Sequence, residues 1–143
     1  MSGTRESLEG LVAAEHRRID SLFAQLLADL REGGENRALR NAFSQLQNQL
    51  EAHLAREDCL YYPALRALRP AHREPLAGII AAHDTFRSQL VRIETSLAQS
   101  AIETALRSLE SLASLFAAHE VAEEQMLHEI DREIRAEDLT SAG

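Results

Sequence analysis

Four stretches of the chain carry apolar residues at steps of three and four, and this pattern limits what the chain can fold into. Such steps place the apolar side chains along one face of an α-helix. Strand-like alternation is missing, and six Gly and three Pro in 143 residues are few for an all-β chain with many turns. The sequence therefore predicts an all-α protein that forms an antiparallel up-down-up-down four-helix bundle.

The first helix is expected to begin near Ser7 and to end at Gly33-Gly34, because glycine favours helix C-termini. The second is expected over Glu35–Leu68, with a kink or an early end at Pro63, which removes a backbone donor. The third starts near Pro75, and Ser100 to Glu103 reads as a capping box that opens the fourth.

The length predicts a single domain over residues 1–143, with its core over about 7–135. Residues 1–6 are polar and are expected to be frayed. Residues after about Arg135 are also polar and are expected to form a loose tail.

Charge and composition exclude several classes of partner. The net charge of −8 argues against nucleic acid or an anionic membrane as the main partner. The single cysteine, Cys59, permits no internal disulfide and favours a reducing compartment. No apolar run approaches the roughly 20 residues of a membrane helix, and the first fifteen residues lack a signal-peptide core. A cytoplasmic location is expected.

A histidine interrupts each apolar stripe, and in two stripes a glutamate follows four residues later, on the same helix face. A buried carboxylate without a partner costs several kcal/mol, and no arginine lies on the stripes at that level. A pair of divalent cations would compensate these groups, whereas the plainer alternative is a hydrogen-bonded polar core. Imidazole and carboxylate ligands suit iron, manganese or zinc. The candidate metal ligands are His16, His53, Glu57, His83, His119 and Glu123.

The order His, His-x-x-x-Glu, His, His-x-x-x-Glu over roughly His16 to Ile130 resembles the hemerythrin-like, or HHE cation-binding, domains. The resemblance implies a non-haem centre of two iron ions joined by an oxo or hydroxo group. It implies that His16 and His53 bind one iron, that His83 and His119 bind the other, and that Glu57 and Glu123 bridge them. Glu124 also follows His119, but Glu123 lies closer to the histidine's face of the helix.

One ligand of the oxygen-carrying members of that family is missing. Their third helix supplies two histidines four residues apart, whereas here Ile79 and Arg87 flank His83 at that distance. The centre is therefore expected to have more open positions for O2, NO, peroxide or water. This hypothesis favours onward redox chemistry or slow autoxidation over reversible oxygen transport.

The leading expectation is thus a protein that binds or senses O2, NO or peroxide. The alternatives are an enzyme that reduces peroxide or NO, a protein of iron homeostasis or iron–sulfur repair, and a helical interaction module without metal. The expected partner is a small diatomic or peroxide ligand, and the sequence identifies no protein partner or electron donor.

Other polar residues are expected to support the centre or to lie outside it. Tyr61, four residues after Glu57, is expected to be a core tyrosine or to contact a bridging carboxylate or an iron. Four acids could accept hydrogen bonds from the outer histidine nitrogens: Asp58, Asp84, Glu120 and Glu124. Three residues are expected to lie away from the site: Cys59, His72 and His128.

Overall fold

A computed structural model describes the backbone of residues 7–142 and the side chains of residues 7–136. The predicted frayed segment, residues 1–6, lies outside the described residues. Within the described part all regular structure is helical, which confirms the predicted all-α fold. The elements are α1 (Leu8–Glu32), α2 (Asn36–Arg56), η1 (Glu57–Tyr61), α3 (Tyr62–Leu68), η2 (Pro70–His72), α4 (Arg73–Ala98) and α5 (Ile102–Ala142).

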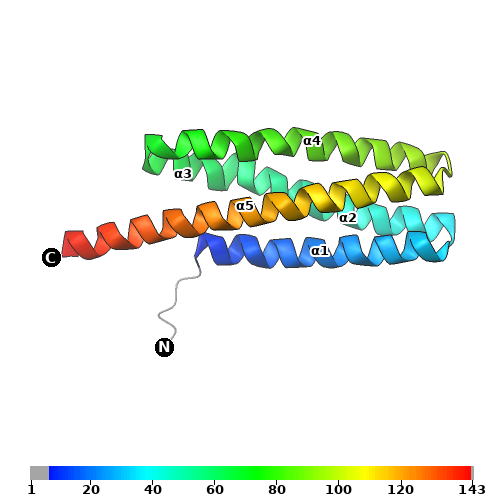
Figure 1. Cartoon of the computed structure of the whole chain (residues 1–143), viewed down its shortest axis with the longest axis horizontal. Coiled ribbons are helices and arrows are strands. Elements are labelled where there is room, and N and C mark those ends of the chain that lie inside the picture. Colours follow the sequence, from blue (N-terminus) through cyan, green and yellow to red (C-terminus); the bar gives the residue numbers. More distant parts are fainter. Residues whose placement is uncertain (1–6, 143) are drawn as a thin grey trace, which may run out of the picture.

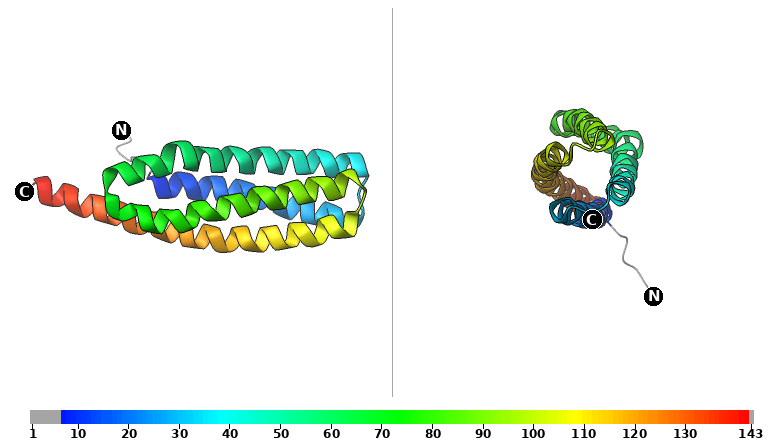
Figure 2. Two further views of the ribbon diagram at one scale, coloured as in Figure 1. Left: turned by 90° about the horizontal axis from the view of Figure 1, so that it is seen from above. Right: turned by 90° about the vertical axis from the view of Figure 1, so that its right-hand side faces the viewer.

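The long helices form the predicted antiparallel bundle (Figure 1). Viewed along the bundle in Figure 2, each helix packs against two others, so that α1 lies between α2 and α5, and α4 also lies between α2 and α5. No helix in the described part is long and apolar enough to cross a lipid bilayer.

Local chemistry explains where α1 begins and ends. The Ser7 side chain accepts a hydrogen bond from the Gly10 amide at 3.0 Å, which caps the first turn. Gly33 ends the helix with φ at 73°, a left-handed conformation that a side chain would strain. Both predicted limits of the first helix are confirmed.

The predicted capping box at the start of the fourth helix is wrong. Ser100 has φ at 58° and belongs to the end of α4, where its amide donates to the Leu97 carbonyl. The Ala101 amide donates to the Ser96 carbonyl, and these bonds close the last turn of α4. The Ala101 carbonyl then accepts from Ala105 and starts α5. Ser100 therefore lies at the C-terminal end of α4 and does not cap α5.

The loose tail predicted after Arg135 is also wrong. Helix α5 continues to Ala142 and runs past the ends of the other helices (Figure 1). Each residue added to an existing helix gains a backbone hydrogen bond without a new nucleation cost, so a polar stretch can continue a helix that has already formed.

Pro63 changes the second helix in a way that positions the site. Without an amide N–H, Pro63 cannot donate to the preceding turn, and the chain forms a π-helical turn, η1, just before it. The Tyr62 amide donates to the Glu57 carbonyl, five residues earlier instead of four. In place of the expected kink, the helix therefore has a π-helical turn with one extra residue. The extra residue places the Tyr62 side chain in the core and leaves Tyr61 partly exposed.

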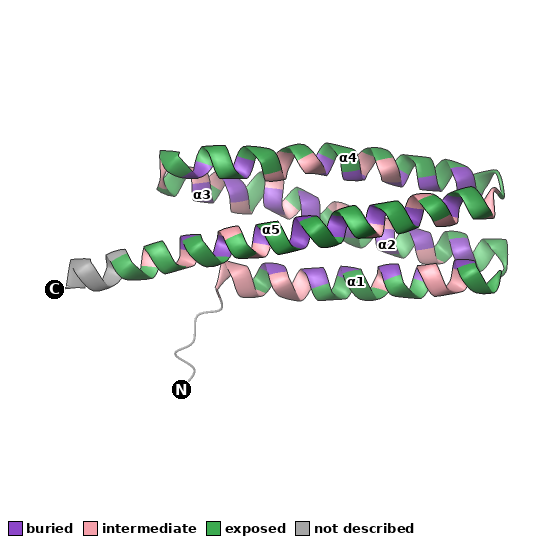
Figure 3. Ribbon diagram, in the orientation of Figure 1, coloured by how far each residue is buried: buried purple, intermediate pink, exposed green. Residues whose placement is uncertain are grey.

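The bundle has two apolar clusters with a polar layer between them. The larger cluster includes Leu46, Leu90 and Phe116, and the smaller one includes Val12, Tyr62 and Leu127. Figure 3 shows the buried residues following the inward faces of all the helices. The four histidines of the apolar stripes lie between the clusters.

Candidate metal centre

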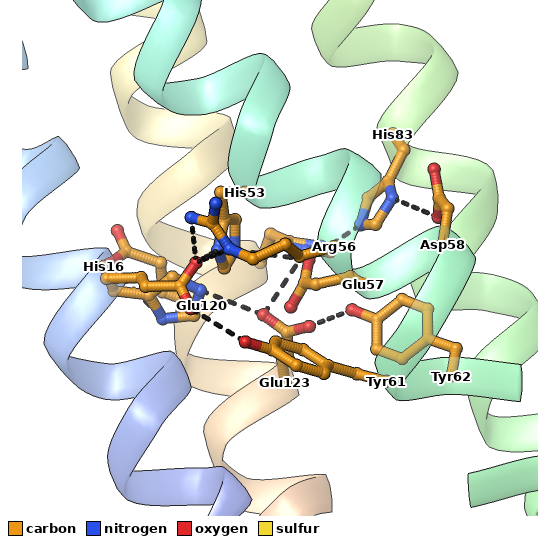
Figure 4. Close-up of polar contacts among 12 residues, drawn as sticks. His16, His53, Arg56, Glu57, Asp58, Tyr61, Tyr62, His83, Glu120 and Glu123 are labelled. Atoms are coloured by element: carbon orange, nitrogen blue, oxygen red, sulfur yellow. Dashed lines mark hydrogen bonds and ion pairs between the residues drawn. The ribbon is translucent and has the colours of Figure 1, made fainter. Parts of the chain in front are cut away.

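The structure brings the six predicted ligands together in the middle of the bundle, as Figure 4 shows for His16, His53, Glu57, His83 and Glu123. They come from every long helix and from the π-helical turn. Five are at most 1% exposed, and His119 is 8% exposed. In order along the chain they are His16 on α1, His53 on α2, Glu57 on η1, His83 on α4, and His119 and Glu123 on α5.

The inner polar atoms of these residues lack hydrogen bonds. The Nε2 atoms of all four histidines, both carboxylate oxygens of Glu57 and Oε1 of Glu123 are buried without a hydrogen-bond partner. Nε2 of His16 lies 2.9 Å from Oε1 of Glu123, but the contact lacks hydrogen-bond geometry. Buried polar groups are normally paired, because an unpaired one costs free energy. This set of converging nitrogen and oxygen donors fits metal ions.

The donor atoms form two groups that share one residue. His16, His53, Glu57 and Glu123 offer atoms within 4.8 Å of one another, and so do Glu57, His83 and His119. Nε2 of His53 and Nε2 of His83 lie 3.2 Å and 3.3 Å from Oε1 of Glu57. Glu57 thus lies between the two pairs of imidazoles.

Carboxylates hold the outer nitrogens of three of the histidines. Nδ1 of His53 donates to Glu15 at 2.9 Å, and Nδ1 of His83 donates to Asp58 at 2.8 Å. Nδ1 of His16 donates to Glu124 at 2.8 Å. A carboxylate can only accept, so these contacts place the proton on Nδ1 and leave the Nε2 lone pair facing inward, as a metal ligand requires.

Two of the three supporting acids accept hydrogen bonds from arginine side chains. Arg56 donates to Glu15 at 2.6 Å, and Arg87 donates to Asp58 at 2.9 Å. Of the four acids predicted to support the histidines, Asp58 and Glu124 do so. Asp84 does not, because its side chain is 90% exposed.

Glu120 is the fourth of these acids, and its buried carboxyl lies 3.7 Å from Nδ1 of His16. Burial first, and then its hydrogen bond with Asp20, raise the pKa of Glu120 to about 9. Glu120 is therefore neutral at pH 7, and the carboxylate hydrogen-bonded to His16 is that of Glu124.

Two residues that contact the ligands were not predicted to do so. The Tyr62 hydroxyl donates to Oε2 of Glu123, whereas Tyr61 donates to Glu15 at 3.2 Å, outside the ligand cluster. The extra residue in η1 explains why Tyr62, and not Tyr61, contacts the candidate ligand Glu123. Pro63 was the sequence signal for the extra residue. Glu15 gave no such signal, because the helical period does not say which neighbouring helix a flanking acid will meet.

The two central carboxylates differ in their affinity for a proton. Burial acts most strongly on Glu57, but contacts with Glu123, His53 and His83 outweigh it and lower the pKa of Glu57. Burial, and then the charge of Glu57, raise the pKa of Glu123 well above its usual value. Glu57 is therefore ionised and Glu123 protonated when no cation is bound. A bound cation would displace that proton.

His119 is expected to stay neutral in mildly acidic solution. Burial first, and then the neighbouring His83, lower the pKa of His119 to about 4, against about 6.5 in an unfolded chain. Between these values the unfolded state binds a proton that the folded state does not, so this residue costs stability as the pH falls from about 6.5 towards 4. In metal-free protein, NMR titration of the imidazole should show His119 uncharged at pH 5.5. A midpoint above pH 6 would contradict the burial argument.

The remaining residues lie where the sequence predicted. Cys59 is exposed. Nδ1 of His72 donates to the Leu65 carbonyl at 2.8 Å, and His128 pairs with Glu9 at the surface. None of the three contributes to the two donor groups described above.

Comparison with known proteins adds one match. The family model described as the hemerythrin HHE cation binding domain matches residues 8–130, which include all six candidate ligands. Neither the curated proteins nor the solved structures gave a match to the chain.

Proposed function

This chain belongs to the hemerythrin HHE cation-binding domain family, and we propose that it is a non-haem di-iron protein that binds or senses O2, NO or peroxide. Family membership and the buried His/Glu clusters together indicate metal-ion binding. The observation that carries the proposal is the set of inner nitrogen and oxygen atoms that are buried without hydrogen bonds.

Two ions fit the donor set better than one. His16 and His53 would hold one ion, and His83 and His119 would hold the other. Glu123, which the family resemblance implied as a second bridge, groups only with the first pair of histidines, so it would bind that ion. Glu57 belongs to both groups, and both of its oxygens are unpaired, so it is suited to bridge the ions. The mixture of imidazole and carboxylate ligands is one that iron accepts.

Tyr62 makes the two carboxylates unequal. Its hydroxyl occupies Oε2 of Glu123 and leaves only Oε1 unpaired. Glu123 is therefore arranged to offer one oxygen, and Glu57 to offer two. Glu123 is fully buried, whereas the Glu124 side chain is 36% exposed and holds His16, which favours Glu123 over Glu124 as the ligand.

No residue replaces the missing histidine on α4. Ile79 packs against the smaller apolar cluster, and Arg87 binds Asp58. The group of Glu57, His83 and His119 has one member fewer than the other group. When bound, an iron pair supplies electrons and open coordination positions for a small ligand. The shortage of protein ligands supports sensing, or the alternative of peroxide or NO reduction, over reversible oxygen carriage.

The test is metal analysis followed by titration of the anaerobic, reduced protein with O2 while the optical spectrum is recorded. About two irons per chain are expected, with loading dependent on deprotonated ligands. One zinc or no metal would contradict the proposal. If the spectrum of the reduced protein returned under vacuum, the protein would be an oxygen carrier. Repeated consumption of added peroxide or NO would instead indicate an enzyme that reduces them.

A further inference from the structure

A groove on the surface between α4 and α5 extends to His119, one of the six candidate ligands. It has a volume of about 470 Å³, and no charged residue lines it in the described part of the chain. Its lining includes Ala82 and Phe86 from α4, and Leu115, Ala118, His119 and Ala122 from α5. The alanines keep the two helices' side chains short at this point, and Leu115 is an exposed apolar residue.

His119 connects this groove with the centre. Its Nε2 is one of the buried inner atoms, yet its ring also lines the groove and packs edge-on against Phe86 at 4.9 Å between ring centroids. Among the four candidate ligand histidines, His119 alone has no carboxylate hydrogen-bonded to Nδ1. It is also the most exposed of the four. The groove therefore ends at the outer side of the His119 ring, whose Nε2 is a candidate metal ligand.

Charged side chains cover the other three contacts between neighbouring helices at this level. Glu15 and Arg56 join α1 to α2. The Asp58–Arg87 pair joins η1 to α4, and Glu124 joins α5 to His16 on α1. Figure 4 shows Arg56 near His53 and the Asp58 carboxylate bonded to His83. An approaching molecule would have to break hydrogen-bonded contacts on these three sides, but not between α4 and α5.

The side with the groove is also the side with fewer ligands. The group of Glu57, His83 and His119 includes the histidine that lines the groove. A molecule that came through the groove would thus meet the metal position at which protein ligands leave more space.

We infer that the groove between α4 and α5 is the access route by which small uncharged ligands reach the metal centre. The inference rests on the proposed di-iron function. Anions would lose hydration in an apolar groove that offers no cationic side chain, so the route favours O2, NO and hydrogen peroxide over azide or superoxide.

The kinetic test fills the groove with larger side chains and leaves all six candidate metal ligands unsubstituted. In iron-loaded Ala118→Leu/Ala122→Leu protein, stopped-flow mixing of the reduced centre with NO should show association and dissociation both slowed, by at least about tenfold. The equilibrium affinity should be unchanged, because the ligands are unchanged. Ala117→Leu is the matched control, since Ala117 is exposed on the same helix and does not line the groove. Its rates should equal those of the wild type.

A second readout does not depend on iron reactivity. Crystals of the metal-loaded protein pressurised with xenon should show the gas in the groove of the wild type and not in that of the double leucine variant, because xenon occupies apolar cavities. Normal rates in an iron-loaded double variant, or xenon reaching the centre only between other helices, would overturn the inference and leave the proposed function intact. Absence of iron in the wild type would instead overturn the proposed function.

Discussion

Glu57→Gln is expected to lose both metal ions while keeping the fold. Glu57 is the residue common to both donor groups, and its two oxygens are buried and unpaired. Glutamine has nearly the same shape but carries no charge and offers an amide group where one oxygen would bind metal. We expect iron content to fall from about two per chain to well below one, since ligand exchange of this kind removes both charge and donor.

The stability readout separates metal binding from folding. A metal present at about a thousand times its Kd adds about 4 kcal/mol to the stability of the folded state, and this gain should disappear in Glu57→Gln. Without metal, the variant should unfold at a lower denaturant concentration than the wild type, because the contacts that outweigh the burial of Glu57 and lower its pKa are lost. Calorimetry and urea unfolding with and without iron would measure both effects.

Glu110→Gln is the control for this experiment, because Glu110 is a half-exposed acid that pairs with Arg31. It should bind iron as the wild type does. Retention of two irons by Glu57→Gln would show that Glu57 is not a shared ligand, and that the two donor groups bind metal independently.

Phe116→Ala is expected to reduce both stability and metal affinity. Phe116 is fully buried, and its ring lies 5.6 Å from His16, 6.3 Å from His53 and 6.1 Å from His119, measured between ring centroids. It therefore forms the apolar wall against which three imidazoles rest. Truncation of a buried phenylalanine costs about 3–5 kcal/mol through lost burial and a residual cavity.

Urea unfolding of the metal-free protein should show that loss, and metal titration should show weaker binding, since the imidazoles can then leave their positions. Phe116→Leu is the matched control, because it keeps most of the apolar volume and should retain two irons with a smaller loss of stability. If alanine and leucine variants bound metal equally well, packing by Phe116 would not be what holds the histidines in place.

In the metal-free protein, the polar layer between the two apolar clusters contains a buried negative charge. Glu57 is ionised and Glu123 keeps a proton, so the bundle buries one carboxylate charge between apolar clusters. The contacts of Glu57 with Glu123, His53 and His83 partly compensate that charge. Cations would complete the compensation, which couples metal binding to stability.

The sequence by itself determined the fold class and the six residues that meet in the core. The apolar period placed His16, His53, His83 and His119 on inward faces, and spacing by four placed Glu57 on the face of His53. Ser7 and Gly33 marked the limits of α1 through their local backbone chemistry. These features depend on residues close together in the chain, which is why the sequence could predict them.

Only the tertiary structure decided what surrounds those six residues. A helical period gives the direction of a side chain around its own axis, but not which neighbouring helix it meets, so Glu15 could not be assigned to His53 beforehand. One inserted residue in η1 shifts every later side chain by about 100°, and this brought Tyr62 to Glu123 in place of Tyr61. The groove beside His119 likewise exists only because short side chains from two helices meet there.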